Sequence, residues 1–182
     1  MSFLTLQTKS LSEYKIPEIK VDENLLDIAK LKADVAEAGS PIPLLKSALK
    51  TSDDVLNFRY QEGQDIDYIV KGRAGVVDEI LKLAWTALNW PDPSNICLIA
   101  VGGYGRGELL PHSDVDLLIL TKSSWNKKYQ DYVSSFLTML WDIGLEPGHS
   151  VRSIRQCKNE ASRDITIATA LMESRILTGN SD

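Results

Sequence analysis

GGYGRGELLPHSDVD occupies residues 102–116, and two short apolar runs flank it. ICLIAV lies before it at 96–101, and LLIL follows it at 117–120. Both runs are rich in branched residues and bounded by helix and strand breakers, which predicts two buried strands. A glycine-rich loop is therefore expected to connect the first strand to a second strand, which begins with two aspartates.

Asp114 and Asp116 occupy alternate positions where the second strand begins. Alternate residues of a strand point to the same face, so the spacing predicts adjacent carboxylates with Val115 turned into the core. Two like charges this close raise each other's pKa, and a divalent cation relieves the conflict. Oxygen ligands at an open, partly hydrated site suit Mg²⁺ or Mn²⁺. We expect both aspartates to be metal ligands and catalytic residues.

Gly102, Gly103 and Gly105 supply the other half of the predicted site. Glycine adopts positive φ at little cost, which lets backbone N–H groups approach a ligand and form an anion-binding nest. A phosphate nest beside a carboxylate pair is typical of a nucleoside triphosphate site. The run fits neither the Gly-Lys-Ser/Thr phosphate loop nor the dinucleotide fingerprint, because the spacing differs and a strand is expected to follow.

Three other polar side chains lie in this stretch. Arg106 could bind a triphosphate through its forked donors, or it could pair with Glu108. Ser113 could donate a hydrogen bond to a phosphate oxygen or contact the adjacent backbone. For His112 we expect an exposed or structural position.

The Gly-Gly pair, the spacer and the Ser-Asp-Val-Asp run resemble the polymerase-β-like nucleotidyltransferase superfamily. The longer string GGYGRGELLPHSDVDLLIL is similar to the N-terminal catalytic domain of the bacterial PII uridylyltransferase/uridylyl-removing enzyme family. RYQEGQDIDYIVKGRAGVVDEIL before it, and LWDIGLEPGHSVRSI and DITIATALMESRIL after it, extend the resemblance over residues 44–179.

The resemblance implies an α+β, polymerase-β-like fold: a small mixed sheet with packed helices, preceded by a helical N-terminal region. It implies transfer of UMP from UTP, with Mg²⁺ or Mn²⁺, to a tyrosine of the PII nitrogen-signalling protein in the bacterial cytoplasm, with release of pyrophosphate. Family members continue into an HD hydrolase domain and glutamine-sensing ACT domains. We therefore expect this chain to be the transferase part of a longer, multifunctional enzyme.

A third acidic ligand is absent from its expected place. The superfamily usually carries it on a later strand, but the candidate strand reads His149-Ser150-Val151-Arg152. Glu146 and Asp164 are near in sequence; spacing alone places neither, and Asp164 can equally cap a helix. Two alternatives stay open: a nucleotidyltransferase with another acceptor, and a non-catalytic nucleotide-binding or interaction module.

Composition and charge argue against several classes of protein. The 182 residues carry a formal net charge of −5, which disfavours a broad nucleic-acid or anionic-membrane surface. The sequence has no apolar run of transmembrane length. Cys97 and Cys157 provide neither a disulfide framework nor a zinc spacing, so we expect a reducing cytoplasm.

Apolar periodicity predicts the remaining elements. We expect helices at 22–39, 41–63, 65–89, 124–142, 154–161 and 164–179, and a third strand at 149–154. We expect Pro147-Gly148 to turn the chain before that strand, Gly144 and Gly179 to stop helices, and Trp141 to lie in the buried stripe of the helix at 124–142. Residues 51–54, rich in Ser and Asp, could break the second helix. We divide the chain into an N-terminal extension at 1–40, a helical region at 41–93 and a nucleotidyltransferase core at 94–182.

The helix expected at 65–89 carries several residues that are compatible with more than one environment. Gly72 and Gly75 could allow another element to pack closely. Lys71 and Arg73 could approach a phosphate, although a solvated face is the better supported interpretation. Trp85 and nearby Trp90 are expected in the core and at its rim, not as a platform for stacking bases.

Overall fold

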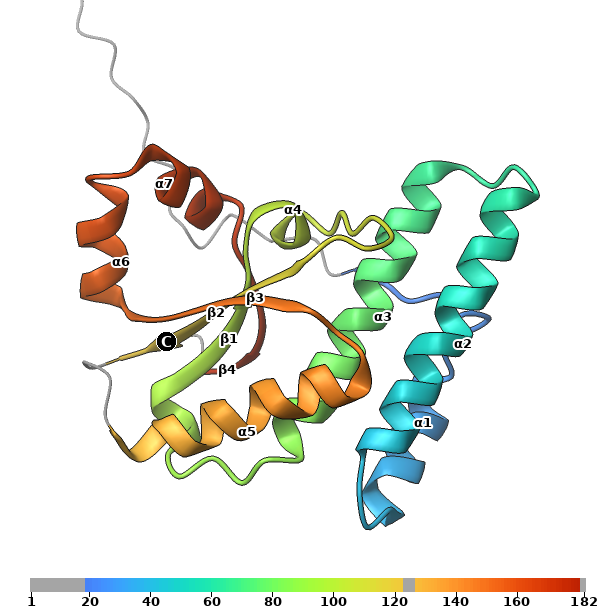
Figure 1. The fold of residues 1–182 in the computed structure, drawn as a ribbon, viewed down its shortest axis with the longest axis horizontal. Coiled ribbons are helices and arrows are strands. Elements are labelled where there is room, and N and C mark those ends of the chain that lie inside the picture. Colours follow the sequence, from blue (N-terminus) through green and yellow to red (C-terminus); the bar gives the residue numbers. More distant parts are fainter. Residues whose placement is uncertain (1–18, 123–126, 181–182) are drawn as a thin grey trace, which may run out of the picture.

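The computed structural model describes residues 19–122 and 127–180. Within them lies a mixed sheet with helices on both faces (Figure 1). Its strand order is β3-β2-β1-β4, where β1 pairs antiparallel with β2 and β4, and β2 pairs parallel with β3. The α+β fold with a small mixed sheet is therefore confirmed. The strands are β1 (Ile96–Ala100), β2 (Val115–Thr121), β3 (Pro147–Ser153) and β4 (Arg175–Gly179).

The helices match most of the predicted periods. The one predicted at 154–161 is confirmed at both ends, and the first begins later than predicted because Asp27 caps it by accepting a hydrogen bond from the Lys30 N–H at 2.9 Å. The start predicted at Ser124 lies outside the described residues. The helices are α1 (Ile28–Glu37), α2 (Ile42–Gln61), α3 (Ile66–Thr86), α4 (Gly102–Gly105), α5 (Lys127–Ile143), α6 (Ile154–Ala161) and α7 (Ile165–Met172), with a 3₁₀ turn η2 (Pro93–Asn95).

The two faces of the sheet have different partners. Val115, Leu117 and Ile119 of β2 join the main core with residues of α3 and α5. Leu118, on the opposite face, packs with Cys157 of α6 in a smaller cluster. Because side chains alternate along a strand, Asp116 shares the α6 and α7 face with Leu118.

The helix predicted at 164–179 is wrong in its second half. Asp164 caps α7 as predicted, but the helix ends at Met172 and the chain returns as β4, pairing with β1. β1 is a central strand, so its outer N–H and C=O groups need a partner. Gly179, predicted to stop the helix, instead pairs with Cys97 at φ +99°.

The turn predicted at Pro147-Gly148 is also wrong, because both residues belong to β3. They pair with Val115 and Asp116 of β2. β3 is an edge strand, and an edge tolerates proline because a missing N–H can face outward. The predicted third strand therefore begins two residues earlier and lines up with the start of β2.

α2 runs unbroken through residues 51–54, so the predicted break is wrong. Ser52 is buried, and its hydroxyl donates a hydrogen bond to the Leu25 carbonyl at 2.8 Å. Asp53 pairs with Arg73 of α3 at 2.5 Å. Residues that favour turns in isolation are here held in a helix by tertiary partners.

Ser52→Ala is expected to lower the free energy of unfolding by about 1–2 kcal/mol, because it leaves the buried Leu25 carbonyl without its donor. Urea denaturation at a fixed temperature measures the change. Ser47→Ala, on an exposed part of the same helix, serves as control and should change stability by less than about 0.5 kcal/mol. Equal losses in the two variants would contradict the role given to Ser52.

Close packing around α3 explains its two glycines. A Cβ at Gly72 would lie 3.0 Å from Leu25 Cδ1, and a Cβ at Gly75 would lie 3.0 Å from Val21 Cγ2. The prediction that these glycines admit another element is confirmed. The solvated face predicted for Arg73 is wrong: its side chain is buried with 8% exposure, whereas Lys71 is exposed and pairs with Asp67.

The tryptophans pack in the main core. Trp85 and Trp90 stack with ring centroids 4.0 Å apart, and Phe136 of α5 meets Trp85 edge-on at 5.3 Å. Both indoles are buried, which confirms a packing role. Trp141, predicted in the buried stripe of α5, is wrong, because 55% of it is exposed.

Candidate functional site

The glycine run forms a single helical turn, α4, between β1 and the loop that leads to β2. Gly102 has φ +61°, as predicted, but Gly103 and Gly105 do not adopt positive φ. Gly105 is needed for another reason: a Cβ there would lie 2.0 Å from the Glu173 carbonyl oxygen. The run therefore combines one left-handed residue with one very close backbone contact.

The two aspartates lie where β2 begins. Val115 between them is buried with 3% exposure, as predicted, whereas Asp114 and Asp116 are exposed. Asp116 Oδ2 lies 3.6 Å from the position that a Cβ on Gly102 would take, so the carboxylate faces the start of the glycine turn. Burial, followed by the nearby Asp114 charge, raises the pKa of Asp116.

Gly148 is a site residue that the sequence did not reveal. It pairs with Asp116 across the parallel β2–β3 ladder, and a Cβ on it would lie 2.5 Å from Asp116 Oδ1. Any larger residue would occupy the space that the carboxylate uses. A glycine inside a strand is the signal for such a close approach, but the Pro147-Gly148 pair is also typical of a turn.

A buried ionic network holds the glycine turn in place. The Tyr104 hydroxyl donates to Asp78 Oδ1 of α3 at 2.7 Å, and Arg175 Nη2 of β4 donates to the same oxygen at 3.0 Å. Arg175 also donates to the carbonyls of Tyr104 and Gly105, each at 3.3 Å. Burial and the neighbouring Asp78 charge raise the pKa of Tyr104.

These contacts cross three elements, because α3, α4 and β4 each contribute one side chain. Asp78 and Arg175 are only 3% and 7% exposed, and their ion pair satisfies both charges. A buried charge is costly unless it is paired and hydrogen-bonded, so this network specifies one position for α4. The sequence shows an acid in an apolar helix and an arginine in an apolar run, but not that they meet.

Arg106 pairs with acids at the surface. Its guanidinium contacts Glu108 at 2.9 Å and Glu173 at 2.8 Å, and these hydrogen bonds raise its pKa. Of the two alternatives for Arg106, the structure contains the pairing with Glu108. Exposed ion pairs of this kind contribute little free energy, which leaves Arg106 able to exchange partners. Ser113 is exposed and immediately precedes Asp114.

Asp164 and Glu146 are the two candidates for a third acidic ligand. Asp164 accepts a hydrogen bond from the Thr166 N–H at 2.8 Å, which lowers its pKa and fits a capping role. Glu146 precedes β3, and its carbonyl accepts from the Val115 N–H. Residues 19–122 and 127–180 hold no cluster of three or more His, Cys, Asp or Glu arranged for a metal. Two carboxylates fit Mg²⁺, which commonly takes one or two and completes its shell with water and phosphate oxygens.

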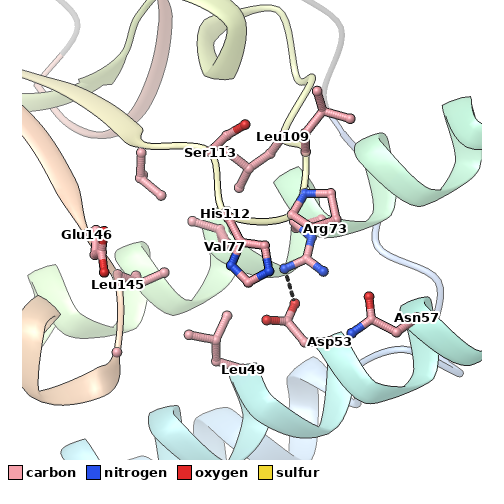
Figure 2. Close-up of a pocket in the computed structure, with 14 residues that line it drawn as sticks. Leu49, Asp53, Asn57, Arg73, Val77, Leu109, His112, Ser113, Leu145 and Glu146 are labelled. Atoms are coloured by element: carbon pink, nitrogen blue, oxygen red, sulfur yellow. Dashed lines mark ion pairs between the residues drawn. The ribbon is translucent and has the colours of Figure 1, made fainter.

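A cavity of about 230 Å³ lies between α2, α3 and the 109–113 loop (Figure 2). The Arg73–Asp53 ion pair lies in it, and the His112 imidazole points toward it from a left-handed backbone with φ 62°. Burial raises the pKa of Asp53, more than its Arg73 partner lowers it. Neither Asp114 nor Asp116 lines this cavity. The cavity is lined instead by residues 109–113 of the loop that leads to the aspartates.

Comparison with known families gives a match that covers this part of the chain. Residues 81–167 match the family model described as a nucleotidyltransferase domain. The chain carries a nucleotidyltransferase domain. The matched residues include the glycine turn and both aspartates, whereas β4 and its Arg175 lie beyond them.

Curated relatives named bifunctional uridylyltransferase/uridylyl-removing enzyme are similar to most of this chain. The Azotobacter vinelandii enzyme is 49% identical over 160 residues, and those of Pseudomonas putida W619 and Pseudomonas aeruginosa LESB58 are 46% and 48% identical. Each alignment covers 88% of this chain and 18% of the relative. The nucleotidyltransferase domain therefore corresponds to a small part of these proteins.

No solved structure matches the chain. Among the described residues, none of the helices combines the length and hydrophobicity needed to cross a membrane.

Gly148→Ala is expected to weaken metal-dependent nucleotide binding by about tenfold or more, because the new methyl group displaces the Asp116 carboxylate from its place beside Gly102. Calorimetric titration with UTP and Mg²⁺ measures the change. Gly39→Ala is the matched control, since a Cβ there meets nothing within 4 Å. Unchanged affinity in Gly148→Ala would show that Asp116 does not bind the metal-nucleotide complex from this position.

Proposed function

We propose that the domain transfers UMP from UTP to a tyrosine of the PII nitrogen-signalling protein, releasing pyrophosphate, in a reaction that requires Mg²⁺ or Mn²⁺ and occurs in the cytoplasm. One observation carries the chemistry: the Asp116 carboxylate faces the left-handed Gly102 turn, beside Asp114. The uridylyl group is supported by relatives whose names state uridylyl transfer. The choice of PII as acceptor follows from the resemblance of residues 44–179 to the PII uridylyltransferase family.

The aspartates would hold the metal and thereby position the triphosphate. A divalent cation bound there would neutralise phosphate charge and favour ionisation of the acceptor hydroxyl. The backbone N–H groups of Gly103 and Tyr104 lie in the first turn of α4. They precede the Gly105 N–H, which donates a hydrogen bond to the Val101 carbonyl. They are placed to contact phosphate oxygens, with Arg106 and Ser113 as neighbouring donors. The protein contributes mainly positioning and charge stabilisation.

Incubation with UTP labelled at the α-phosphorus, Mg²⁺ and PII tests the proposal. Label should join PII, pyrophosphate should appear in equal amount, and a PII variant with phenylalanine at its acceptor tyrosine should stay unlabelled. Label on a different acceptor would instead indicate another nucleotidyltransferase. Metal-dependent binding of UTP with no transfer would indicate a nucleotide-binding module, the remaining alternative.

A further inference from the structure

A second cavity, of about 160 Å³, lies between the sheet and α7, on the face that carries Asp116. Most of its wall is aliphatic, and the polar side chains come from β3 and α7. A concave, mostly apolar surface with a few convergent polar groups is the usual form of a small-molecule subsite. Residues that define the cavity are Val101, Leu118, Ile167 and Leu171 on its apolar side, and Ser150 and Arg152 on its polar side.

The cavity lies farther along the same face of the sheet than Asp116. Leu118 follows Asp116 by two residues along β2, and Ser150 follows Gly148 by two along β3. Two strand residues span about 6.6 Å, so the cavity begins roughly that far along the sheet from Asp116. Val101, which lines the cavity, directly precedes Gly102. A nucleotide whose phosphates lie at the glycine turn would thus extend its nucleoside toward this cavity.

Arg152 gives the cavity a hydrogen-bonding preference. Its side chain is about a quarter exposed, and its Nε pairs with Glu160 of α6 at 2.8 Å. This ion pair orients the guanidinium through Nε, and the two terminal nitrogens are further donors. Guanidinium groups donate hydrogen bonds and accept none, so the terminal nitrogens match a carbonyl oxygen and not an amino group.

We propose that this cavity binds the base of the nucleoside triphosphate, and that Arg152 selects uracil over cytosine by donating to the uracil 4-carbonyl. The inference rests on the proposed function and adds a base-specificity residue to it. Cytosine carries an amino group at the same position, and adenine also presents one, whereas uracil presents an acceptor. The Ser150 hydroxyl can accept the uracil N3–H on the same edge.

Arg152→Gln tests the proposal, because the glutamine amide can both donate and accept and so removes the discrimination. The preference for UTP over CTP, measured as the ratio of kcat/KM in transfer and as the ratio of Kd by calorimetry, should fall about tenfold or more. The loss should appear chiefly in KM for UTP. Ser150→Ala is a second variant in case Arg152→Gln does not fold. It should weaken binding of UTP by a smaller factor, because it removes the hydroxyl that accepts the uracil N3–H.

Two matched variants separate base recognition from a structural role. Arg155→Gln removes an exposed arginine from α6 and should leave the ratio unchanged. Glu160→Gln removes the negative charge but keeps a side-chain oxygen that can accept from Arg152 Nε and orient the guanidinium, so it should also keep the preference for UTP. Thermal melts check that each variant is folded.

The outcomes distinguish this inference from the proposed function. Wild-type transfer of UMP with an unchanged UTP/CTP ratio in folded Arg152→Gln would overturn the base site and leave the proposed function standing. If Arg152→Gln does not fold, an unchanged Kd for UTP in folded Ser150→Ala would do the same. Absence of transfer by the wild type would overturn the proposed function, while the calorimetric ratio would still decide whether Arg152 selects the base.

Discussion

Asp114→Asn/Asp116→Asn is expected to lower the rate of nucleotide transfer by on the order of 10³-fold or more. The substitution removes both negative charges that would hold the metal, but it preserves side-chain size. Metal-dependent UTP binding should be lost in the same variant. Single-turnover transfer at saturating Mg²⁺, together with calorimetry, measures both effects.

The same double variant should stay folded. Both carboxylates are exposed. Burial, followed by repulsion from Asp114, raises the pKa of Asp116, and neutral amides would remove both effects. Asp131→Asn/Asp142→Asn makes the same change in net charge on the exposed side of α5 and serves as control. Transfer within about threefold of wild type in the aspartate variant would show that the metal is held elsewhere.

Asp78→Ala is expected to destabilise the protein by about 3–5 kcal/mol, because it leaves the buried Arg175 charge without its partner. It should also raise KM for the nucleotide, since α4 loses its link to α3. Urea denaturation measures the first effect, and initial rates at varied UTP measure the second.

Tyr104→Phe isolates the link between α3 and α4. It removes one hydrogen bond but leaves the Asp78–Arg175 ion pair, so the loss of stability should be about 1 kcal/mol. Asp34→Ala, an exposed acid on α1, controls for loss of a carboxylate. If Asp78→Ala lowered the free energy of unfolding no more than Asp34→Ala does, the network would not fix the position of the glycine turn.

Local signals were sufficient for the elements around the aspartates. The strands at 96–101 and 117–120, the inward turn of Val115 and the stop at Gly144 follow from side-chain alternation and from one residue's access to positive φ. Capping by Asp164 also depends only on residues within the next turn. Such features need no knowledge of the rest of the chain.

Tertiary contacts decided the remainder. Residues 175–179 became β4 because β1 has a second edge to pair, and the sequence of this segment alone does not reveal that edge. Asp78 and Arg175 meet across 97 positions of sequence, and Gly148 matters only because β3 brings it beside Asp116. The glycines and aspartates of the candidate site thus lie in one local stretch of sequence. The side chains that fix their positions come from distant segments, which burial and strand pairing bring together.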